Sequence, residues 1–312
     1  MKTAFVFPGQ GSQSVGMMAA YAEAHGDLIH AVFEEAGAAL GENLWGLVCE
    51  GPAETLNQTI QTQPAMLTAG VAVWRAWQAQ GGPMPDLMAG HSLGEYTALT
   101  CAGAIDFADA VRLVRLRAEA MQAAVPAGVG AMAAVLGLDD DATRAVCAEA
   151  AQGEVCEAVN FNSPGQVVIA GHKSAVDRAC VLAKEKGAKR ALPLPVSVPS
   201  HCALMRPAAE KLLAAMRDIA FRTPVVPVLH NADVASHQDP DAIRDALARQ
   251  LYQPVRWVES MQAASTAGIE LIAECGPGKV LAGLNKRILD NTPTLALADG
   301  AALADALARA RG

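Results

Sequence analysis

Apolar residues along this chain alternate between short runs typical of buried strands and longer stretches with a helical period. The short runs predict strands at residues 4–7, 85–89, 225–229, 269–273 and 294–298. The helical stretches lie between and after them, at residues 17–40 (broken near Gly26), 52–59, 64–80, 93–104, 106–124, 203–219, 240–250, 257–267, 280–289 and 301–309. Strands that alternate with helices predict an α/β fold with a mostly parallel sheet covered by helices.

The middle of the chain follows a different order of elements. Strands are predicted at residues 131–136, 155–161, 167–170 and 191–196, with helices at 139–152 and 173–187. This β-α-β-β-α-β order is that of a ferredoxin-like α+β module. We therefore predict a discontinuous α/β core, residues 1–125 and 197–312, with a ferredoxin-like subdomain inserted at residues 126–196.

Composition narrows the class of protein. With 312 residues, 52% hydrophobic and 18% charged, the chain can bury a large core, and its net charge of -8 argues against general nucleic-acid binding. No apolar run approaches a membrane span, and no signal peptide is visible. The seven cysteines are scattered, without a C-x-x-C pair, so we expect no metal site and no disulfide framework. These features predict a cytoplasmic protein with free thiols.

The sequence Gly90-His91-Ser92-Leu93-Gly94 stands between a predicted strand and a predicted helix. A serine with glycines two places before and after it, in this setting, is typical of a nucleophile elbow. Such a tight turn exposes the serine oxygen at the positive end of a helix, where backbone N–H groups can receive an oxyanion. The alternative is a simple glycine-serine turn, because the motif also occurs by chance.

A serine needs a nearby base to act as a nucleophile at neutral pH. Five of the seven histidines lie in or beside helices, in the insertion, in a polar loop, or next to Ser92 itself. His201 and His230 remain, each in a loop at or just beyond the end of a strand, where α/β active sites form. Position alone favours His201 only slightly. No aspartate is an evident partner for its second nitrogen, so a backbone or amide carbonyl is the expected orienting group.

Arg117 falls within the apolar arc of the helix predicted at residues 106–124, beside Leu113, Val114 and Met121. A buried arginine needs a partner because removing its charge from water is unfavourable. One interpretation is a structural salt bridge to an acidic residue elsewhere in the fold. The other is that its partner is a carboxylate that arrives with a substrate.

Seven motifs occur in order along the chain: FPGQGSQ (7–13), TQPA (62–65), GHSLGEY (90–96), the R-L-R stretch with Arg117, VNFNSPGQVVIAG (159–171), VPSHC (198–202) and ECGPGKVL (274–281). Together they resemble the discrete bacterial malonyl-CoA:acyl carrier protein transacylases of type II fatty acid synthesis. The resemblance implies an α/β-hydrolase-like core with a ferredoxin-like insertion, in agreement with the predicted elements.

The resemblance also implies roles for individual residues. The catalytic set is Ser92 as nucleophile, His201 as base, the Gln250 main-chain carbonyl as the group that orients His201, the N–H groups of Gln10 and Leu93 as oxyanion hole, and Arg117 as the site of the malonyl carboxylate. Gln63, Asn160 and Asn162 match motifs and are expected in the substrate site, together with Met121. His230 matches no motif position, which favours His201 as the base.

The implied reaction moves a malonyl group from coenzyme A to the phosphopantetheine thiol of an acyl carrier protein through a malonyl-Ser92 ester. No metal or redox cofactor is expected. Carrier proteins of this pathway are acidic, so a local basic patch is needed for docking, and we select Lys189, Arg190, Lys286 and Arg287. Three alternatives stay open: an acyltransferase that supplies a polyketide synthase, a serine esterase or thioesterase, and a carrier-binding scaffold without catalysis.

Overall fold

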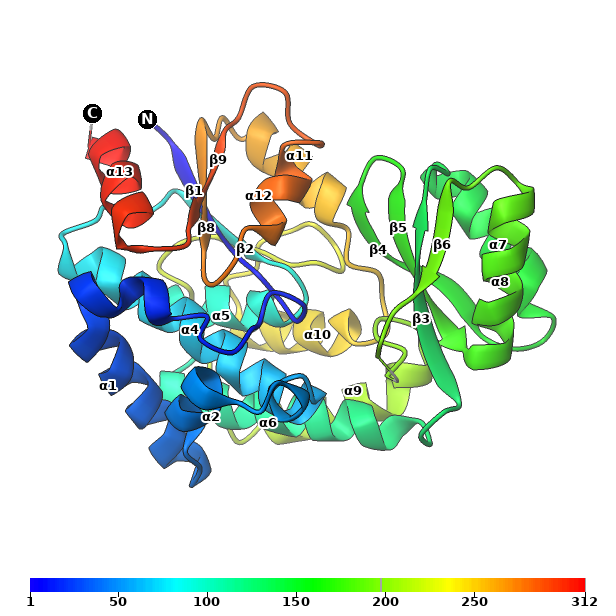
Figure 1. Ribbon diagram of the computed structural model, residues 1–312, viewed down its shortest axis with the longest axis horizontal. Coiled ribbons are helices and arrows are strands. Elements are labelled where there is room, and N and C mark those ends of the chain that lie inside the picture. Colours follow the sequence, from blue (N-terminus) through cyan, green and yellow to red (C-terminus); the bar gives the residue numbers. More distant parts are fainter. Residues whose placement is uncertain (197, 312) are drawn as a thin grey trace.

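The computed structural model describes residues 1–196 and 198–311 and contains two β-sheets (Figure 1). Residues 197 and 312, the two ends of the second predicted core segment, lie outside the described residues. The larger sheet has five strands in the order β7-β2-β1-β8-β9, and every neighbouring pair is parallel. Its strands are β1 (Thr3–Phe7), β2 (Leu87–Gly90), β7 (Val228–Leu229), β8 (Leu271–Cys275) and β9 (Thr294–Leu297). The predicted parallel sheet is confirmed.

Both faces of the parallel sheet are buried. Along β1, Phe5 and Phe7 belong to the large cluster on one face, whereas Ala4 and Val6 belong to the cluster on the other. The large cluster packs α1 (Ala22–Leu40), α2 (Leu44–Glu50), α3 (Ala53–Leu56), α4 (Thr59–Ala79), α5 (Leu93–Cys101), α6 (Phe107–Ala124), α9 (Arg206–Met216), α10 (Pro240–Gln250) and α13 (Gly300–Arg311). The other cluster packs α11 (Trp257–Thr266) and α12 (Val280–Asn285).

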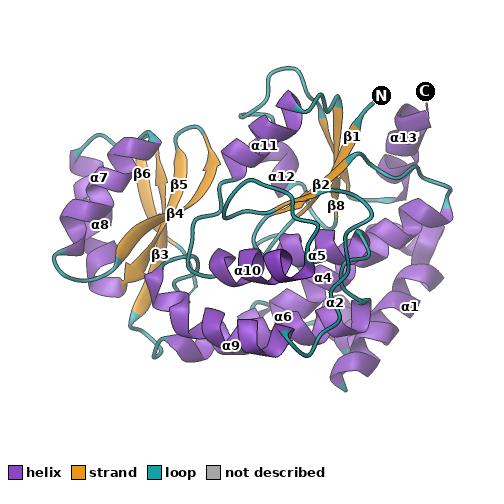
Figure 2. Cartoon of the chain, turned by 180° about the vertical axis from the view of Figure 1, so that it is seen from behind, coloured by secondary structure: helices purple, strands orange, loops and turns teal. Residues whose placement is uncertain are grey.

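The second sheet follows the predicted ferredoxin-like order. Its elements are β3 (Gly130–Leu136), α7 (Asp140–Ala151), β4 (Cys156–Ser163), β5 (Gln166–His172), α8 (Lys173–Glu185) and β6 (Arg190–Pro193). The strands pair antiparallel in the order β4-β5-β3-β6. Helices α7 and α8 cover the face that points away from the parallel sheet (Figure 2). The ferredoxin-like prediction is confirmed, and the division into two domains stays a prediction.

The structure differs from the predicted elements at α4, β6 and α2. Helix α4 begins at Thr59, not at Pro64, because the carbonyl of Ile60, which a proline cannot satisfy, accepts a hydrogen bond of 2.9 Å from the Arg115 side chain. Strand β6 ends at Pro193, three residues early, as Pro195 has no N–H to donate. Helix α2 was not predicted. Among the described residues, no helix is both long and apolar enough to cross a membrane.

Candidate active site

A cavity of about 300 Å³ lies between the two sheets. The parallel-sheet side contributes residues from the loop after β1 and from α4, α5 and α6, and the antiparallel sheet contributes residues of β3, β4 and β5. The polar and charged lining residues are Gln10, Thr59, Gln63, His91, Ser92, Arg117, Asn160, Asn162, Gln166, Ser200 and His201. The cavity therefore collects nearly all of the residues that the sequence singled out for catalysis and substrate binding.

Ser92 stands in a strained turn between β2 and α5. Its φ of 52° and ψ of -109° are rare for a residue with a side chain. The neighbouring glycines are sterically required: a Cβ on Gly94 would lie 2.0 Å from the Phe7 carbonyl oxygen, and one on Gly90 would lie 1.8 Å from the Gly94 carbonyl carbon. The local geometry is thus that of a nucleophile elbow.

His201 lies against the serine. Its Nε2 atom is 2.7 Å from Ser92 Oγ, and its Nδ1 atom is 2.7 Å from the main-chain oxygen of Gln250. Because a carbonyl oxygen only accepts, Nδ1 carries the proton and Nε2 is free to accept the Ser92 hydroxyl proton. Burial, reinforced by the nearby Arg117 charge, lowers the pKa of His201 to about 3, so the imidazole is neutral at physiological pH.

Arg117 is 1% exposed and is held by two glutamine side chains. Its Nη1 atom donates to Gln63 Oε1 at 2.8 Å, and its Nη2 atom donates to Gln250 Oε1 at 3.0 Å and to Ser92 Oγ at 3.3 Å. Burial lowers the pKa of the Arg117 guanidinium. Among the described residues it forms no ion pair with a carboxylate, so its charge is solvated by neutral amides and faces the cavity.

Gln10 and Leu93 both line the cavity beside Ser92. Leu93 is the first residue of α5, where a backbone N–H has no partner within the helix. Within the part of the chain that the structure describes, no hydrogen bond from either backbone N–H to another residue is found. Both N–H groups therefore lack a protein acceptor among the described residues, and that of Leu93 lies at the positive, N-terminal end of α5.

The remaining predicted substrate-site residues also line the cavity. Gln63 donates to Met121 Sδ at 3.6 Å as well as accepting from Arg117, so it connects α4 to α6. Asn160 and Asn162 come from β4. Asn162 Oδ1 accepts a hydrogen bond of 2.7 Å from His91 Nε2, which ties the antiparallel sheet to the turn that carries Ser92.

The four basic residues selected for docking are all exposed. Arg287 donates to Gln166 Oε1 at 2.7 Å, and Gln166 lines the cavity. Leu136 pairs with both Gln166 and Arg190 across neighbouring strands, so Arg190 lies two strands away from Gln166. Lys189 and Lys286 are the chain neighbours of these arginines. The basic residues therefore flank one end of the antiparallel sheet, close to the cavity.

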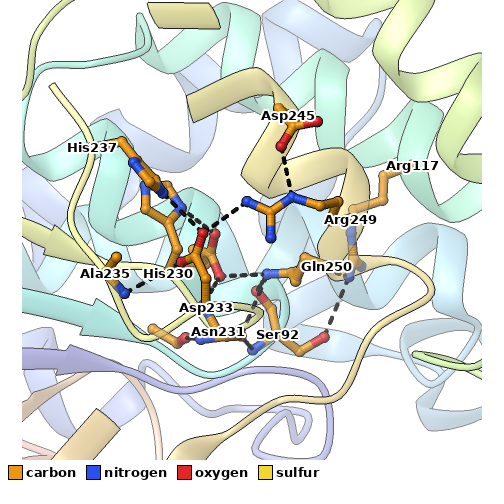
Figure 3. A network of polar contacts seen from close by, with 12 residues as sticks. Ser92, Arg117, His230, Asn231, Asp233, Ala235, His237, Asp245, Arg249 and Gln250 are labelled. Carbon is orange, nitrogen blue, oxygen red and sulfur yellow. Dashed lines mark hydrogen bonds and ion pairs between the residues drawn. The ribbon is translucent and has the colours of Figure 1, made fainter. Parts of the chain in front are cut away.

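His230, the competing histidine, lies beneath the elbow rather than in the cavity. Its Nδ1 atom donates to Glu95 at 2.7 Å, and both side chains are fully buried. Asn231 and the side-chain amide of Gln250 join the same network, which Figure 3 shows next to Ser92. This network was not predicted from the sequence. The available signal was Glu95 itself, a carboxylate within a helix of small and apolar residues, which requires buried partners.

Comparison with known proteins assigns the class. Residues 4–299 match the family described as acyl transferase domain. Acyl transfer through a serine ester requires a nucleophile, a base and donors for the oxyanion. The elbow serine, its paired histidine and the two N–H groups without a protein acceptor fit these requirements.

Relatives at higher identity narrow that class. The malonyl CoA-acyl carrier protein transacylase of Salmonella typhimurium is 61% identical over 304 residues, 97% of this chain and 98% of that protein. The structure of an acyl carrier protein S-malonyltransferase from Vibrio cholerae is 57% identical with a TM-score of 0.96, covering 98% of this chain and 100% of that one. A malonyl-transacylase solved in complex with its type II PKS acyl-carrier protein is 55% identical with a TM-score of 0.97, covering 99% and 100%. The chain belongs to the malonyl CoA-acyl carrier protein transacylases.

Proposed function

We propose that this protein moves a malonyl group from coenzyme A to the phosphopantetheine thiol of an acyl carrier protein through a malonyl ester of Ser92. One observation carries the proposal. Arg117 is buried without a carboxylate partner among the described residues, and its Nη2 atom lies 3.3 Å from the Ser92 oxygen. A malonyl thioester carries its carboxylate on the carbon next to the thioester carbonyl, so its anion can pair with a cation beside Ser92 Oγ while the carbonyl meets the serine.

In the first half-reaction, the malonyl carboxylate pairs with Arg117 while the thioester carbonyl lies over Ser92. His201 Nε2 takes the hydroxyl proton, and Ser92 Oγ attacks the carbonyl carbon. The oxyanion is received by the N–H groups of Gln10 and Leu93, where one donor is typically worth about 3–4 kcal/mol. The Gln250 carbonyl keeps the His201 ring oriented throughout. The C–S bond then breaks, and His201 returns its proton to the coenzyme A sulfur.

In the second half-reaction, the carrier's phosphopantetheine thiol enters the vacated site. His201 takes the thiol proton, and the sulfur attacks the ester carbonyl of malonyl-Ser92. The same two N–H groups stabilise the second oxyanion. The C–O bond breaks, and His201 returns the proton to Ser92 Oγ. Two half-reactions through one covalent intermediate give ping-pong kinetics.

The cleft position supports the predicted division of the chain. We propose residues 1–125 and 197–312 as the catalytic core and residues 126–196 as the smaller domain, with the acyl site between them. The cavity lining draws on both segments. We also propose a cytoplasmic location, because the seven cysteines are free thiols, as expected in a reducing compartment.

One observation supports a polyketide carrier protein as a second candidate acceptor. The relative in complex with a type II PKS acyl-carrier protein is 55% identical to this chain, so a polyketide carrier is an alternative acceptor for the same chemistry. A hydrolase is disfavoured, since neutral acyl groups give the buried Arg117 no partner.

The proposal is tested by intact-protein mass spectrometry after mixing with malonyl-CoA. Wild-type protein should gain the mass of one malonyl group and lose it when a carrier protein in its phosphopantetheine form is added. Ser92→Ala should gain nothing. Immediate loss of the adduct to water in wild-type protein would identify a hydrolase, and absence of an adduct would contradict the covalent mechanism.

A further inference from the structure

Glu95 lies one turn along α5 from Ser92 and is 0% exposed. Its Oε1 atom accepts a hydrogen bond of 2.7 Å from His230 Nδ1. Its Oε2 atom accepts two more, each of 2.9 Å, from the Asn231 N–H and from Gln250 Nε2. One carboxylate thus gathers three donors from two segments of chain, the residues after β7 and the end of α10. A carboxylate is the side-chain group best suited to this, because it offers only acceptors.

One branch of this network holds the backbone of the elbow. Asn231 Oδ1 accepts from the Ser92 N–H at 2.8 Å (Figure 3). Asn231 Nδ2 donates to the Gly90 carbonyl at 2.7 Å. The Asn231 amide therefore spans the two peptides that flank His91. Because Ser92 has a positive φ, its conformation depends on such surrounding contacts.

The other branch fixes the amide of Gln250. Gln250 Nε2 donates to Glu95 Oε2 and to the Ser92 carbonyl, both at 2.9 Å. With the nitrogen end satisfied by two acceptors, the oxygen end must face Arg117, whose Nη2 lies 3.0 Å away. Rotation of the amide by half a turn would place its NH₂ group against the guanidinium and leave both without an acceptor.

We propose that Glu95 is a positioning residue: through the Gln250 amide it fixes Arg117 beside Ser92, and so it sets selectivity for acyl groups that carry a carboxylate. The proposal rests on the proposed function, because it assigns the selectivity of that same site. Glu95 makes no contact with the cavity itself. Its effect passes through one intervening side chain to the cation, and through Asn231 to the nucleophile's backbone.

A purely structural role makes a different prediction. A buried Glu95–His230 pair that only stabilised the fold would change thermal stability and leave the preference between malonyl-CoA and acetyl-CoA untouched. The preference is therefore the informative measurement, since a neutral acetyl group does not use Arg117.

The test compares kcat/KM for malonyl-CoA and acetyl-CoA in Glu95→Met, which keeps an unbranched side chain of similar length and removes both carboxylate oxygens, including the acceptor that orients Gln250. We expect kcat/KM for malonyl-CoA to fall roughly 10- to 100-fold, the value of a hydrogen bond to a charged group, with a smaller loss for acetyl-CoA. The control is Glu119→Gln, an exposed carboxylate on the same helix as Arg117, which should behave as wild type.

Gln250→Leu tests the same contact from the other side, because it keeps the main-chain oxygen on His201 and removes the amide. It should lower the malonyl-to-acetyl ratio similarly, and the double variant should lose no more than the single ones, since both changes break one path. An unchanged ratio in Gln250→Leu, or in folded Glu95→Met, overturns the proposal. Failure of wild-type protein to transfer malonyl would instead overturn the proposed function.

Discussion

The Nη2 atom of Arg117 lies 3.3 Å from Ser92 Oγ, so a positive charge lies beside the nucleophile. Among the described residues, Arg117 contacts no carboxylate, and its Nη2 atom donates to the Gln250 side chain instead. The same charge acts on His201, whose pKa it helps to lower. Substrate recognition and activation of the base are therefore coupled through a single guanidinium, and the two functions can be separated experimentally.

The first prediction concerns pH. The base must be neutral to accept the serine proton, and a pKa lowered from 6.5 to about 3 keeps it neutral far into the acid range. The rate at which a neutral fluorophosphonate labels Ser92 should therefore stay nearly constant from about pH 8 to pH 5, where an ordinary histidine would already be mostly protonated. An inflection near 6.5 would contradict the burial and charge effects assigned to His201.

Arg117→Ala provides the matching control for that experiment. Removing the guanidinium removes a positive charge that disfavours the protonated imidazole, so the pKa of His201 must rise. The pH at which the labelling rate begins to fall on acidification must therefore move to a higher value. A shift of that pH to a lower value, or no shift at all, would show that Arg117 does not act on the base.

The second prediction concerns the turn. Gly94→Ala would force a Cβ to 2.0 Å from the Phe7 carbonyl oxygen, a rigid backbone atom. We expect a loss of about 1–3 kcal/mol in the free energy of unfolding, together with loss of Ser92 acylation. Urea unfolding and mass spectrometry measure the two effects.

Gly283→Ala in α12 is the matched control, because a Cβ there meets no atom within 4 Å. It should leave acylation unchanged and raise helix stability by up to about 1 kcal/mol. If both variants behave alike, the close packing of the elbow is not what Gly94 provides.

The third prediction concerns the carrier. Arg287→Glu reverses a charge at the rim of the cavity, beside Gln166. We expect KM for an acidic carrier protein to rise about five- to tenfold, with a weaker dependence on salt, because a rim charge steers association. Formation of malonyl-Ser92 and transfer to free pantetheine should be unchanged. A loss in transfer to pantetheine as well would place Arg287 in the acyl site instead.

Much of the fold follows from local patterns. A predicted strand such as residues 4–7 is apolar on both faces, which indicates a sheet with helices packed on both sides. The structure confirms this. Element ends depend on distant partners and were less predictable. The start of α4 is the clearest case, since the carbonyl that Pro64 leaves free is satisfied by Arg115 from another helix.

The same distinction applies to the site. The main catalytic and binding candidates could be selected from the sequence. A serine between two glycines indicates a nucleophile elbow, and an arginine in an apolar helix face indicates a buried charge that needs a partner. The sequence left the partner of Arg117 open between a protein acid and a substrate. The polar network around Arg117 could not be predicted, since only folding brings its side chains together. Arg117 of α6 joins Gln63 of α4 to Gln250 of α10, and Gln250 in turn contacts Glu95 of α5.

The central claim is that Arg117 binds the carboxylate of the acyl group. Arg117→Ala should lower kcat/KM for malonyl-CoA roughly 100-fold or more, as expected when one partner of a buried ion pair is removed. Acetyl transfer should be retained much better, because an acetyl group has no charge to pair. Arg112→Ala, an exposed arginine on the same helix, is the control and should match wild type.

The most direct measurement is therefore the ratio of kcat/KM for malonyl-CoA to that for acetyl-CoA, determined side by side for wild-type protein, Arg117→Ala and Arg112→Ala. The account predicts that the ratio collapses only in Arg117→Ala. Equal losses for both acyl groups in that variant, leaving the ratio unchanged, would contradict it.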